Sequence, residues 1–557
     1  MGNNRRTRRR AQDRPASGRH ARVLTKGRLA VAAGTGLLAV SSVVWFQSGH
    51  QSAQAGPAVA DADAKPASVS FTGGALVYRP DAAGTTIPDF SSAGYGGGGV
   101  ALPRAAEKTR LDAQAKGDDT ARIQAAVDRV AQLKAGADGT RGAVTLGPGT
   151  FRVRAGIALA DGVVLRGSGT GPGGTLLRAS GKPGSLITIG GGAAYTSTGK
   201  HIEIADARVP VGATKLSVAD ASSFTPGDRV VVQRPTTTAW IKAIGMDKID
   251  GGEGWKPNSG ILAVRTVTAV SANSLTFDAP LTTAIEKRYG GGTVWHYALE
   301  GQVTHAGVEN LAADATAFTE DADYGRPDGG KNREAGAFAS RLLTIGAARD
   351  VWATDVRLTR FGSGFYVDDN ASRVTIERAA DLDMAVPAKL APPPAFMIGG
   401  QQVLVRDTTV TGDRVHAWTT QAYAAGPNVF TRGTATSPSG SGQIDAGPHM
   451  RWGSGTLYDQ LTIVSSDGAF IAANAWDGGT GHGWQGANNV FWNTSSARYT
   501  VLAPPTADNW AFGITGKRTP GKHDGELPVP PRQGTIVSPG APVQPASLYE
   551  EQLRERR

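Results

Sequence analysis

The sequence has no cysteine among its 557 residues and only five methionines. Without a thiol, the chain can form no disulfide framework, no zinc ribbon and no cysteine nucleophile. Its stability must therefore come from the burial of apolar side chains and from backbone hydrogen bonds. Glycine, by contrast, is abundant at 75 residues, and the length allows several domains.

Most of the chain also lacks an excess of charge. Residues 1–28 hold ten Lys and Arg against one Asp, and residues 29–55 carry no Lys, Arg, Asp or Glu. Taking this +9 from the formal net charge of +10 leaves +1 for the residues from Gly56 onward. The basic isoelectric point therefore comes from the leader. The charge of the predicted folded part gives no support for nucleic-acid binding.

The leader has the pattern of an export signal. Its basic region precedes an uncharged run of 18 residues, Leu29 to Phe46, and "AQA" at Ala53 to Ala55 suits a signal-peptidase site. The run is short for a membrane-spanning helix and long for a signal core. We predict that residues 1–55 are a signal peptide, in preference to a membrane anchor. Segment 29–46 would be the only membrane contact, and the protein would be secreted or anchored with its folded part outside.

The first element expected in the folded part is a helix over 117–134. Ile123, Ala126, Val127, Val130 and Leu133 form one apolar stripe at helical spacing, and Asp119 or Thr120 can cap it. Short apolar segments alternating with glycine turns follow over 142–169, as short strands do.

These motifs carry a family resemblance. "DDT..IQ.A.D", "G.V.L.PGTF.V" and "GV.LRG.G" occur here in that order, and together they resemble the opening of the pectate-lyase superfamily. The resemblance implies an all-β fold, a right-handed parallel β-helix whose N-terminal end is covered by an amphipathic helix. Such a cover makes physical sense, because an open coil would expose unpaired strand edges and an apolar core.

The rest of the chain divides by composition and spacing. Residues 205–297 alternate like the strands of a small antiparallel barrel and predict an inserted β domain. Coil-like segments return afterwards, with strand starts near 374, 403, 429, 457 and 490. We therefore expect the following parts, in chain order: leader 1–55, linker and extended lead-in 56–100, capping helix and first coils 101–204, inserted domain 205–297, main β-helix 298–515, and a Pro/Gly-rich tail with a short terminal helix 516–557.

An Asp–His–Trp trio repeats three times in the main coils. The aspartates are 32 and 32 residues apart, the histidines 33 and 33, and the tryptophans 34 and 32; the trios are Asp413, His416, Trp418; Asp445, His449, Trp452; and Asp477, His482, Trp484. On successive coils, equivalent residues stack about 4.8 Å apart, which would place the histidines in one column. Stacked imidazoles cannot all be charged, so at least one should be neutral near pH 7. The alternative is a structural role, in which Asp shapes turns, Trp packs and His fills a polar ladder.

Two chemistries suit such a column. In β-elimination on a uronate polymer, Arg451 would neutralise the sugar carboxylate and His449 or His482 would take the proton. The other histidine, or Tyr458, would return a proton to the leaving oxygen. In glycoside hydrolysis, Asp445 and Asp477 are the natural pair of carboxylates. We expect the substrate to contact His416, Asp477 and the indoles of Trp418, Trp452 and Trp484.

Family motifs favour elimination over hydrolysis. Polygalacturonase-type hydrolases carry "NTD", "DD", "GHG" and "RIK" on adjacent coils. Here "DD" (Asp368, Asp369) and "GHG" (Gly481 to Gly483) are 113 residues apart, and the other two motifs are absent. Arg378, Arg406 and Arg432 are interpreted as outward strand positions, with an anion groove as the alternative.

The sequence predicts no metal site and leaves the cofactor open. Calcium is possible, but no pectate-lyase-like cluster is recognisable, and the acidic loop 319–328 matches no EF-hand. The expected partner is a polysaccharide, cleaved by elimination or, second, by hydrolysis. A non-catalytic glycan-binding or adhesive surface protein is the alternative from another class.

Overall fold

The computed structural model describes residues 66–179, 184–250, 252–315, 341–384, 392–525 and 527–556. The leader, with segment 29–46, and the acidic loop 319–328 lie outside these residues. In the described part of the chain, none of the helices combines the length and apolar character that crossing a membrane requires.

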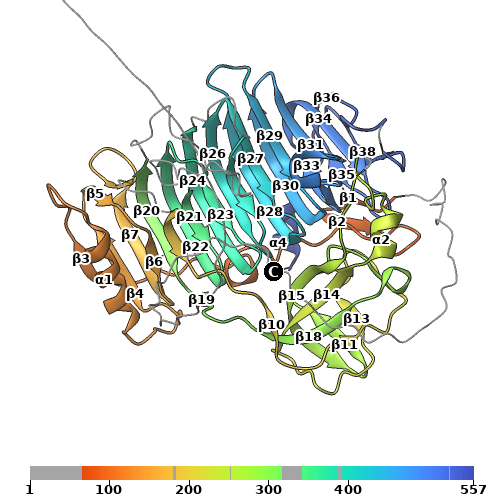
Figure 1. Ribbon diagram of the computed structural model, residues 1–557, viewed down its shortest axis with the longest axis horizontal. Helices are drawn as coiled ribbons and strands as arrows, with labels where there is room; N and C mark the ends of the chain where they lie inside the picture. The colour runs from red at the N-terminus through yellow and green to blue at the C-terminus, as the bar shows by residue number, and fades with distance from the viewer. Residues whose placement is uncertain are drawn as a thin grey trace, which may run out of the picture. The chain divides into compact units, whose positions relative to one another are not determined.

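The expected right-handed parallel β-helix is confirmed: parallel strands stack rung upon rung along the chain and form three faces (Figure 1). The first face consists of β6 (Ile157–Leu159), β9 (Ser185–Ile189), β21 (Arg341–Ile345), β23 (Phe365–Val367), β25 (Pro394–Ile398), β27 (Arg414–Thr420), β29 (Gln443–Pro448), β31 (Gly468–Ala472) and part of β34 (Ser495–Ala503).

The second and third faces share long strands. The second face consists of β3 (Glu107–Leu111), β4 (Gly142–Leu146), β7 (Val163–Gly169), β19 (Val303–Thr304), β32 (Gly486–Ala487), β33 (Val490–Trp492), β35 (Trp510–Phe512), β38 (Thr535–Val537) and the first halves of β20 (Gly307–Asp314), β22 (Ala348–Thr359), β24 (Ala371–Met384), β26 (Leu404–Gly412), β28 (Ala425–Thr436) and β30 (Gly453–Val464). The third face consists of β5 (Gly149–Val153), β8 (Thr175–Ala179), β36 (Thr515–Arg518) and the second halves of those long strands. A short strand, β37 (Arg532–Gln533), pairs antiparallel with β34.

Each long strand bends between its two halves at a residue with positive φ. In successive rungs these include Asp355, Arg378, Asp407 and Arg432, with φ of 54°, 49°, 55° and 51°. The charges alternate along this column, and Arg378 pairs with Asp355 at 2.9 Å and Arg432 with Asp407 at 2.7 Å. Arg406 pairs in the same way with Glu377 at 2.6 Å. The three arginines are therefore neutralised by neighbouring carboxylates, which fits outward strand positions better than an anion groove.

The amphipathic helix α1 (Thr120–Ala131) packs against the first coils (Figure 1). Ile123, Ala126, Val127 and Val130 are buried as the stripe predicted, whereas Leu133 follows the helix and is 40% exposed. Asp119 accepts a hydrogen bond from the backbone N–H of Arg152 at 2.7 Å, so it ties the helix to β5 and makes no side-chain cap.

An antiparallel sheet interrupts the coils between β9 and β19. Its strands are β10 (Thr196–Ser197), β11 (Ile202–Glu203), β13 (Lys215–Ser217), β14 (Arg229–Thr236), β15 (Asn258–Ser271), β16 (Ser274–Phe277) and β18 (Thr293–Ala298), with the pair β12 (Arg208–Val209) and β17 (Ile285–Glu286) beside them. A short helix, α2 (Thr238–Ala243), and a 3₁₀ turn, Lys287–Tyr289, complete this inserted domain.

Arg265 of β15 joins the inserted domain to the coils. Its side chain is fully buried and donates to the carbonyls of Val264, Ala279, Pro280 and Gly426 and to Oε1 of Gln401. Burial lowers the pKa of Arg265 to about 10, so the guanidinium is still charged at neutral pH. One cation thus satisfies acceptors from both parts of the molecule.

The two ends of the described chain pack against each other over the second face, and we call this contact the clasp. Helix α4 (Leu548–Arg556) packs against the hairpin β1 (Ser68–Thr72) and β2 (Ala75–Arg79), and against the lead-in with its 3₁₀ turn Tyr95–Gly97. Gln552 Oε1 accepts from the Phe90 N–H at 2.9 Å, and the Tyr549 hydroxyl donates to the Ala93 carbonyl at 2.9 Å. Ser547 caps α4 by accepting from the Glu550 N–H at 3.1 Å, as its sequence suggests.

Asp381 is a carboxyl group inside the apolar core. It lies in register between Leu358 and Val410, is 0% exposed, and neither oxygen has a hydrogen-bond partner among the described residues. Burial raises its pKa well above the ordinary value. The folded state therefore holds the proton over a pH range in which the unfolded state has lost it.

We expect Asp381→Asn to flatten the pH dependence of stability. Above about pH 4 the unfolded chain releases the Asp381 proton first, so the free energy of unfolding of the natural protein falls as pH rises, until the pH passes the raised folded pKa. The slope from this group reaches about 1.4 kcal/mol per pH unit. Urea unfolding over mildly acidic to neutral pH measures it, with the exposed Asp383→Asn as control. Identical slopes for Asp381→Asn and the natural protein would contradict a neutral carboxyl.

Candidate functional site

The structure brings the three repeated histidines together. His416 lies on β27, His449 directly follows β29, and His482 ends the short turn α3 (Gly478–Gly481) after β31. The ring centroids of His416 and His449 are 4.8 Å apart, and those of His449 and His482 are also 4.8 Å apart. The rings are steeply inclined, at 63° and 60°, so they form a column without stacking face to face.

Asp445 orients the first histidine. It lies beside His416 in the register of β27 and β29, and its Oδ1 is 2.5 Å from Nδ1 of His416. Burial alone lowers the pKa of His416, but the charge and hydrogen bond of Asp445 outweigh it, so the pKa is raised above its usual value. This pairing favours an imidazolium whose Nδ1–H points to Asp445, leaving Nε2 for a ligand.

The other two histidines have lowered pKa values. Burial, followed by the charges of His416 and His482, lowers the pKa of His449 to about 3. Burial, followed by the charges of Arg451 and His416, lowers the pKa of His482. One charged ring beside neutral rings is the arrangement that repulsion between neighbours predicts, and the three titrate as a set.

A small pocket of about 100 Å³ opens among these side chains. It is lined by His416, Thr419, Asp445, Ala446, Gly447, Pro448, His449, Ile471, His482 and Gln485. Gly447 has φ of 138° and lies so close to the Ile471 carbonyl that a Cβ would clash, so a glycine is needed on this wall. Gln485 was not predicted, because a single glutamine in a loop has no distinguishing pattern. Its Oε1 accepts from the Ala473 N–H at 3.1 Å, which fixes its carboxamide.

Arg451 and Asp477 lie near this pocket without lining it. The Arg451 guanidinium donates to the carbonyl of Thr480 at 2.5 Å and to its hydroxyl at 3.1 Å, on the loop that carries His482. Asp477 is exposed at the start of α3 and makes no capping bond. Arg451 is therefore close enough to influence His482, whereas Asp477 does not join Asp445 among the residues that line the pocket.

The predicted stacking role of the three tryptophans does not fit their positions. Trp418, Trp452 and Trp484 are 0%, 1% and 1% exposed. Trp418 packs in the coil core, while Trp452 and Trp484 pack against the inserted domain. All ten tryptophans in the described part of the chain are buried, so no indole face there is open to a sugar ring. The repeat of Trp reflects packing.

Two further candidates, Tyr458 and the "DD" motif, are not among the residues that line the pocket. Tyr458 is fully buried between Phe430 and Phe491, at centroid distances of 5.4 and 4.9 Å, and cannot reach a substrate. Asp368 follows β23, four rungs before the strand that precedes His482, which is roughly 19 Å at the spacing of strands. "DD" and "GHG" thus do not meet in one centre, although burial raises the pKa of Asp368 to about 6.

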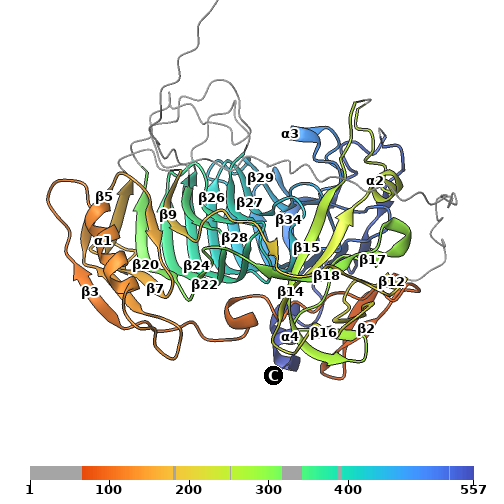
Figure 2. The ribbon, with the colours of Figure 1, turned by 60° about the horizontal axis from the view of Figure 1, so that its bottom comes forward.

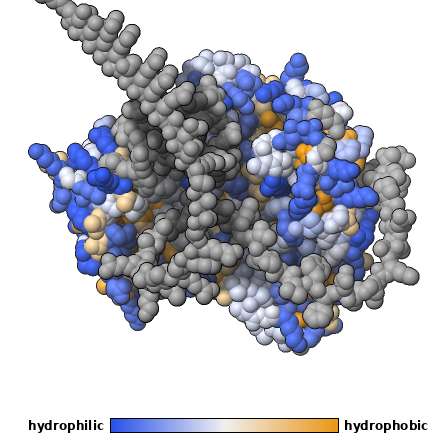
Figure 3. Space-filling model, in the orientation of Figure 1, coloured by the Kyte–Doolittle hydropathy of each residue, from blue (hydrophilic) through white to orange (hydrophobic). Residues whose placement is uncertain are grey.

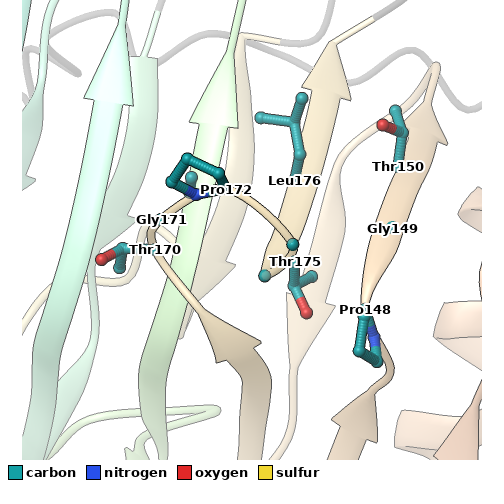
Figure 4. Close-up of a pocket in the computed structure, with 11 residues that line it drawn as sticks. Pro148, Gly149, Thr150, Thr170, Gly171, Pro172, Thr175 and Leu176 are labelled. Atoms are coloured by element: carbon teal, nitrogen blue, oxygen red, sulfur yellow. The ribbon is translucent and has the colours of Figure 1, made fainter.

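A second hollow in the described part of the chain holds no comparable set of groups. A cleft of about 570 Å³ on the third face is lined by Pro148, Gly149, Thr150, Thr170, Gly171, Pro172, Gly173, Gly174, Thr175, Leu176 and Ala312, none of them titratable (Figure 4). On the face seen in Figure 3, hydrophobic residues are scattered among hydrophilic ones. Among the described residues, no group of three or more His, Asp or Glu is arranged to hold a metal ion.

No protein-family model matches the chain, and no curated protein matches it. Among solved structures, it is similar to the gp54 tailspike of Acinetobacter baumannii bacteriophage AP22, solved with A. baumannii capsular saccharide, at 13% identity and a TM-score of 0.40 over 76% of this chain and 63% of that one. It is similar to the polygalacturonase of Erwinia carotovora ssp. carotovora at 11% identity and a TM-score of 0.29, over 75% and 95% of the two chains. It is also similar to a DFA-IIIase variant of Arthrobacter chlorophenolicus A6 in complex with DFA-III, at 10% identity and a TM-score of 0.31, over 80% and 88%. At these identities the likeness concerns the fold.

Proposed function

We propose that this protein is an extracytoplasmic enzyme that cleaves a uronate-containing polysaccharide by β-elimination. One observation carries the proposal: a His416–Asp445 pair and two neutral imidazoles, His449 and His482, line one pocket. A proton donor and a proton acceptor are thereby present in the same place, as elimination requires. The leader sequence supports a location outside the cytoplasm.

His449 is the proposed base. Its low pKa keeps the ring neutral, and the negative charge of an incoming uronate raises its basicity. His449 removes the proton on C5, next to the sugar carboxylate, and the electron pair forms the C4–C5 double bond as the C4–O4 bond breaks. The imidazolium of His416 gives its Nε2 proton to the leaving O4. His449 ends protonated and His416 neutral, and exchange with water restores both.

Arg451 is the proposed partner of the uronate carboxylate. A cation beside that carboxylate lowers the cost of the negative charge that develops when the C5 proton leaves. Arg451 lies on the margin of the pocket, and its guanidinium already bonds the loop of His482. The positive charge of the His416 imidazolium also stabilises this developing negative charge. The pair of cations favours an acidic polysaccharide over a neutral one.

Hydrolysis is the second candidate, and glycan binding without cleavage is the third. Hydrolysis needs two carboxylates around the scissile bond. The described residues that line the pocket include one, Asp445, and it is bonded to His416. A binding module of the expected kind would present exposed aromatic rings, and the described indoles are buried.

A panel of uronic-acid and neutral polysaccharides tests the proposal. Elimination is expected to produce ultraviolet absorbance of an unsaturated uronate together with new reducing ends. Reducing ends without that absorbance would replace the proposal by hydrolysis. Binding of a polysaccharide without either signal would leave a glycan-binding protein.

Asp445→Asn is expected to shift the pH profile of kcat/KM. Asp445 holds the pKa of His416 above its usual value, and without that carboxylate burial lowers it. If His416 acts as an acid, activity is lost as pH rises through its pKa, so the alkaline limb should move to lower pH in the variant. The control is Asp228→Asn, which breaks another His–Asp pair, with His296 at 3.1 Å, in the inserted domain. An alkaline limb that stays in place would remove His416 from the acid role.

A further inference from the structure

The loop that carries His482 lies outside the β-strands of the coils. Residues 473–485 follow β31 and precede β32, and the Arg451 N–H donates to the His482 carbonyl at 3.1 Å. Within the loop, the Ala475 N–H donates to the Gly483 carbonyl at 2.9 Å, and an isolated bridge joins Asn474 and Trp484. Positive φ values occur at Gly479, Gly481 and Gly483, at 61°, 73° and 57°. Glycine backbone is conformationally permissive, so the position of His482 depends both on these hydrogen bonds and on what the loop packs against.

Much of that packing comes from the inserted domain. The indole N–H of Trp255 donates to the carbonyl of Gly481 at 3.1 Å. On the other side of the histidine, the indole N–H of Trp484 donates to the carbonyl of Ile244 at 3.0 Å. The first bond holds the backbone one residue before His482, and the second holds the side chain two residues after it. Helices α2 and α3 stand near each other in Figure 2, in keeping with these contacts.

Tight packing reinforces the two bonds. A Cβ on Gly483 would lie 2.6 Å from Sδ of Met246 and 2.7 Å from the Trp255 ring, so the loop and the inserted domain are in direct contact there. Met246, Trp255 and Trp484 are 1%, 7% and 1% exposed and belong to one apolar cluster. The interface is apolar and close-packed, which is the condition for holding a neighbouring side chain in one place.

The part of the inserted domain that contacts the His482 loop is itself held in place by aromatic contacts. Trp240 of α2 meets Trp452 edge to face at a centroid distance of 4.8 Å, and the Arg234 guanidinium lies over the Trp240 ring at 4.0 Å. The Thr237 hydroxyl caps α2 by accepting from the Trp240 N–H at 3.2 Å. The segment that holds the His482 loop is therefore a supported part of the molecule.

From these contacts we infer that the inserted domain is part of the framework of the histidine pocket, and that Trp255 is a positioning residue for His482. The inference rests on the proposed function, since it assigns the domain a role in that same pocket. Loss of the Trp255 bond should free the Gly481 carbonyl and let the imidazole move relative to His449. Displacements of this kind by about 1 Å can cost up to about 100-fold in rate.

Trp255→Phe tests the inference in the full-length protein, because it keeps an aromatic ring and removes the N–H. Trp295→Phe is the matched control: Trp295 is also in the inserted domain, is 5% exposed, and donates one bond to Gln233 at 3.0 Å, but that bond does not reach the loop. Both variants should lose a similar, small amount of thermal stability. Only Trp255→Phe should lower kcat, by roughly 10- to 100-fold, with KM little changed.

A second measurement does not depend on activity. Histidine-selective NMR titration follows the pKa of the His482 imidazole, assigned by its loss in His482→Gln. In Trp255→Phe this pKa should move toward the ordinary histidine value as the ring becomes more solvated, and in Trp295→Phe it should not. A Trp255→Phe variant that matches Trp295→Phe in both readouts would overturn the inference. If the natural protein cleaves no polysaccharide, the proposed function fails, and the titration alone decides the positioning role.

Discussion

Replacing His449 by glutamine is expected to lower the rate of polysaccharide cleavage by about 100- to 10,000-fold, the usual contribution of a general base. His449 is the middle ring of the column, 4.8 Å from each neighbour, and its neutral state follows from burial between other imidazoles. Glutamine keeps polarity and similar bulk but cannot accept the C5 proton. Because the base acts in the chemical step, kcat should fall while KM stays close to its natural value.

His296→Gln is the matched control for this variant. His296 is partly buried and paired with a carboxylate, like His416, but it lies on β18 of the inserted domain and does not line the pocket. Its replacement should leave kcat unchanged. If His449→Gln retained full activity with an unchanged thermal midpoint, the base would have to be another group, and His482 would be the next to test.

Arg265→Met is expected to destabilise the protein by about 3 to 5 kcal/mol, because several buried acceptors lose their donor at about 1 to 3 kcal/mol each. Methionine fills part of the space but leaves Oε1 of Gln401 with fewer donors and the carbonyls of Pro280 and Gly426 without their 2.6 and 2.8 Å bonds. Unsatisfied buried acceptors carry the larger part of the cost. Urea unfolding measures the change.

Two further variants serve as comparisons for the stability of Arg265→Met. Arg229→Met removes an exposed arginine that bonds Gln302 at 3.1 Å, and it should change stability by no more than about 0.5 kcal/mol. Arg265→Lys keeps the charge but has too few donors for all five acceptors, so it should fall between the two. Equal stability of Arg265→Met and Arg229→Met would show that Arg265 does not join the inserted domain to the coils.

The sequence predicted the fold because local signals agreed with one another. The stripe from Ile123 to Val130 marked a capping helix, and the glycine-separated apolar segments after it marked short parallel strands. The histidine column could be predicted for a related reason. A repeat of 33 residues exceeds one coil by the length of a loop, so each copy returns to the same face of the next rung.

The same repeat misled the interpretation of the tryptophans. Spacing shows that Trp418, Trp452 and Trp484 occupy related places, but it does not show whether the ring faces water or another domain. That depends on the inserted domain, whose residues Ile244 and Trp240 cover two of the three rings. Contacts such as Arg265 with Gln401 join residues 136 positions apart and leave no local pattern in the chain.

The clasp between the two ends of the described chain has a consequence for how the molecule is made. Phe90 bonds Gln552, which is 462 residues further on. At about 5 to 20 residues per second, a ribosome takes roughly 20 to 90 s to synthesise that interval. For all of that time the hairpin and the lead-in lack their contacts with α4, so closure belongs to the last stage of folding.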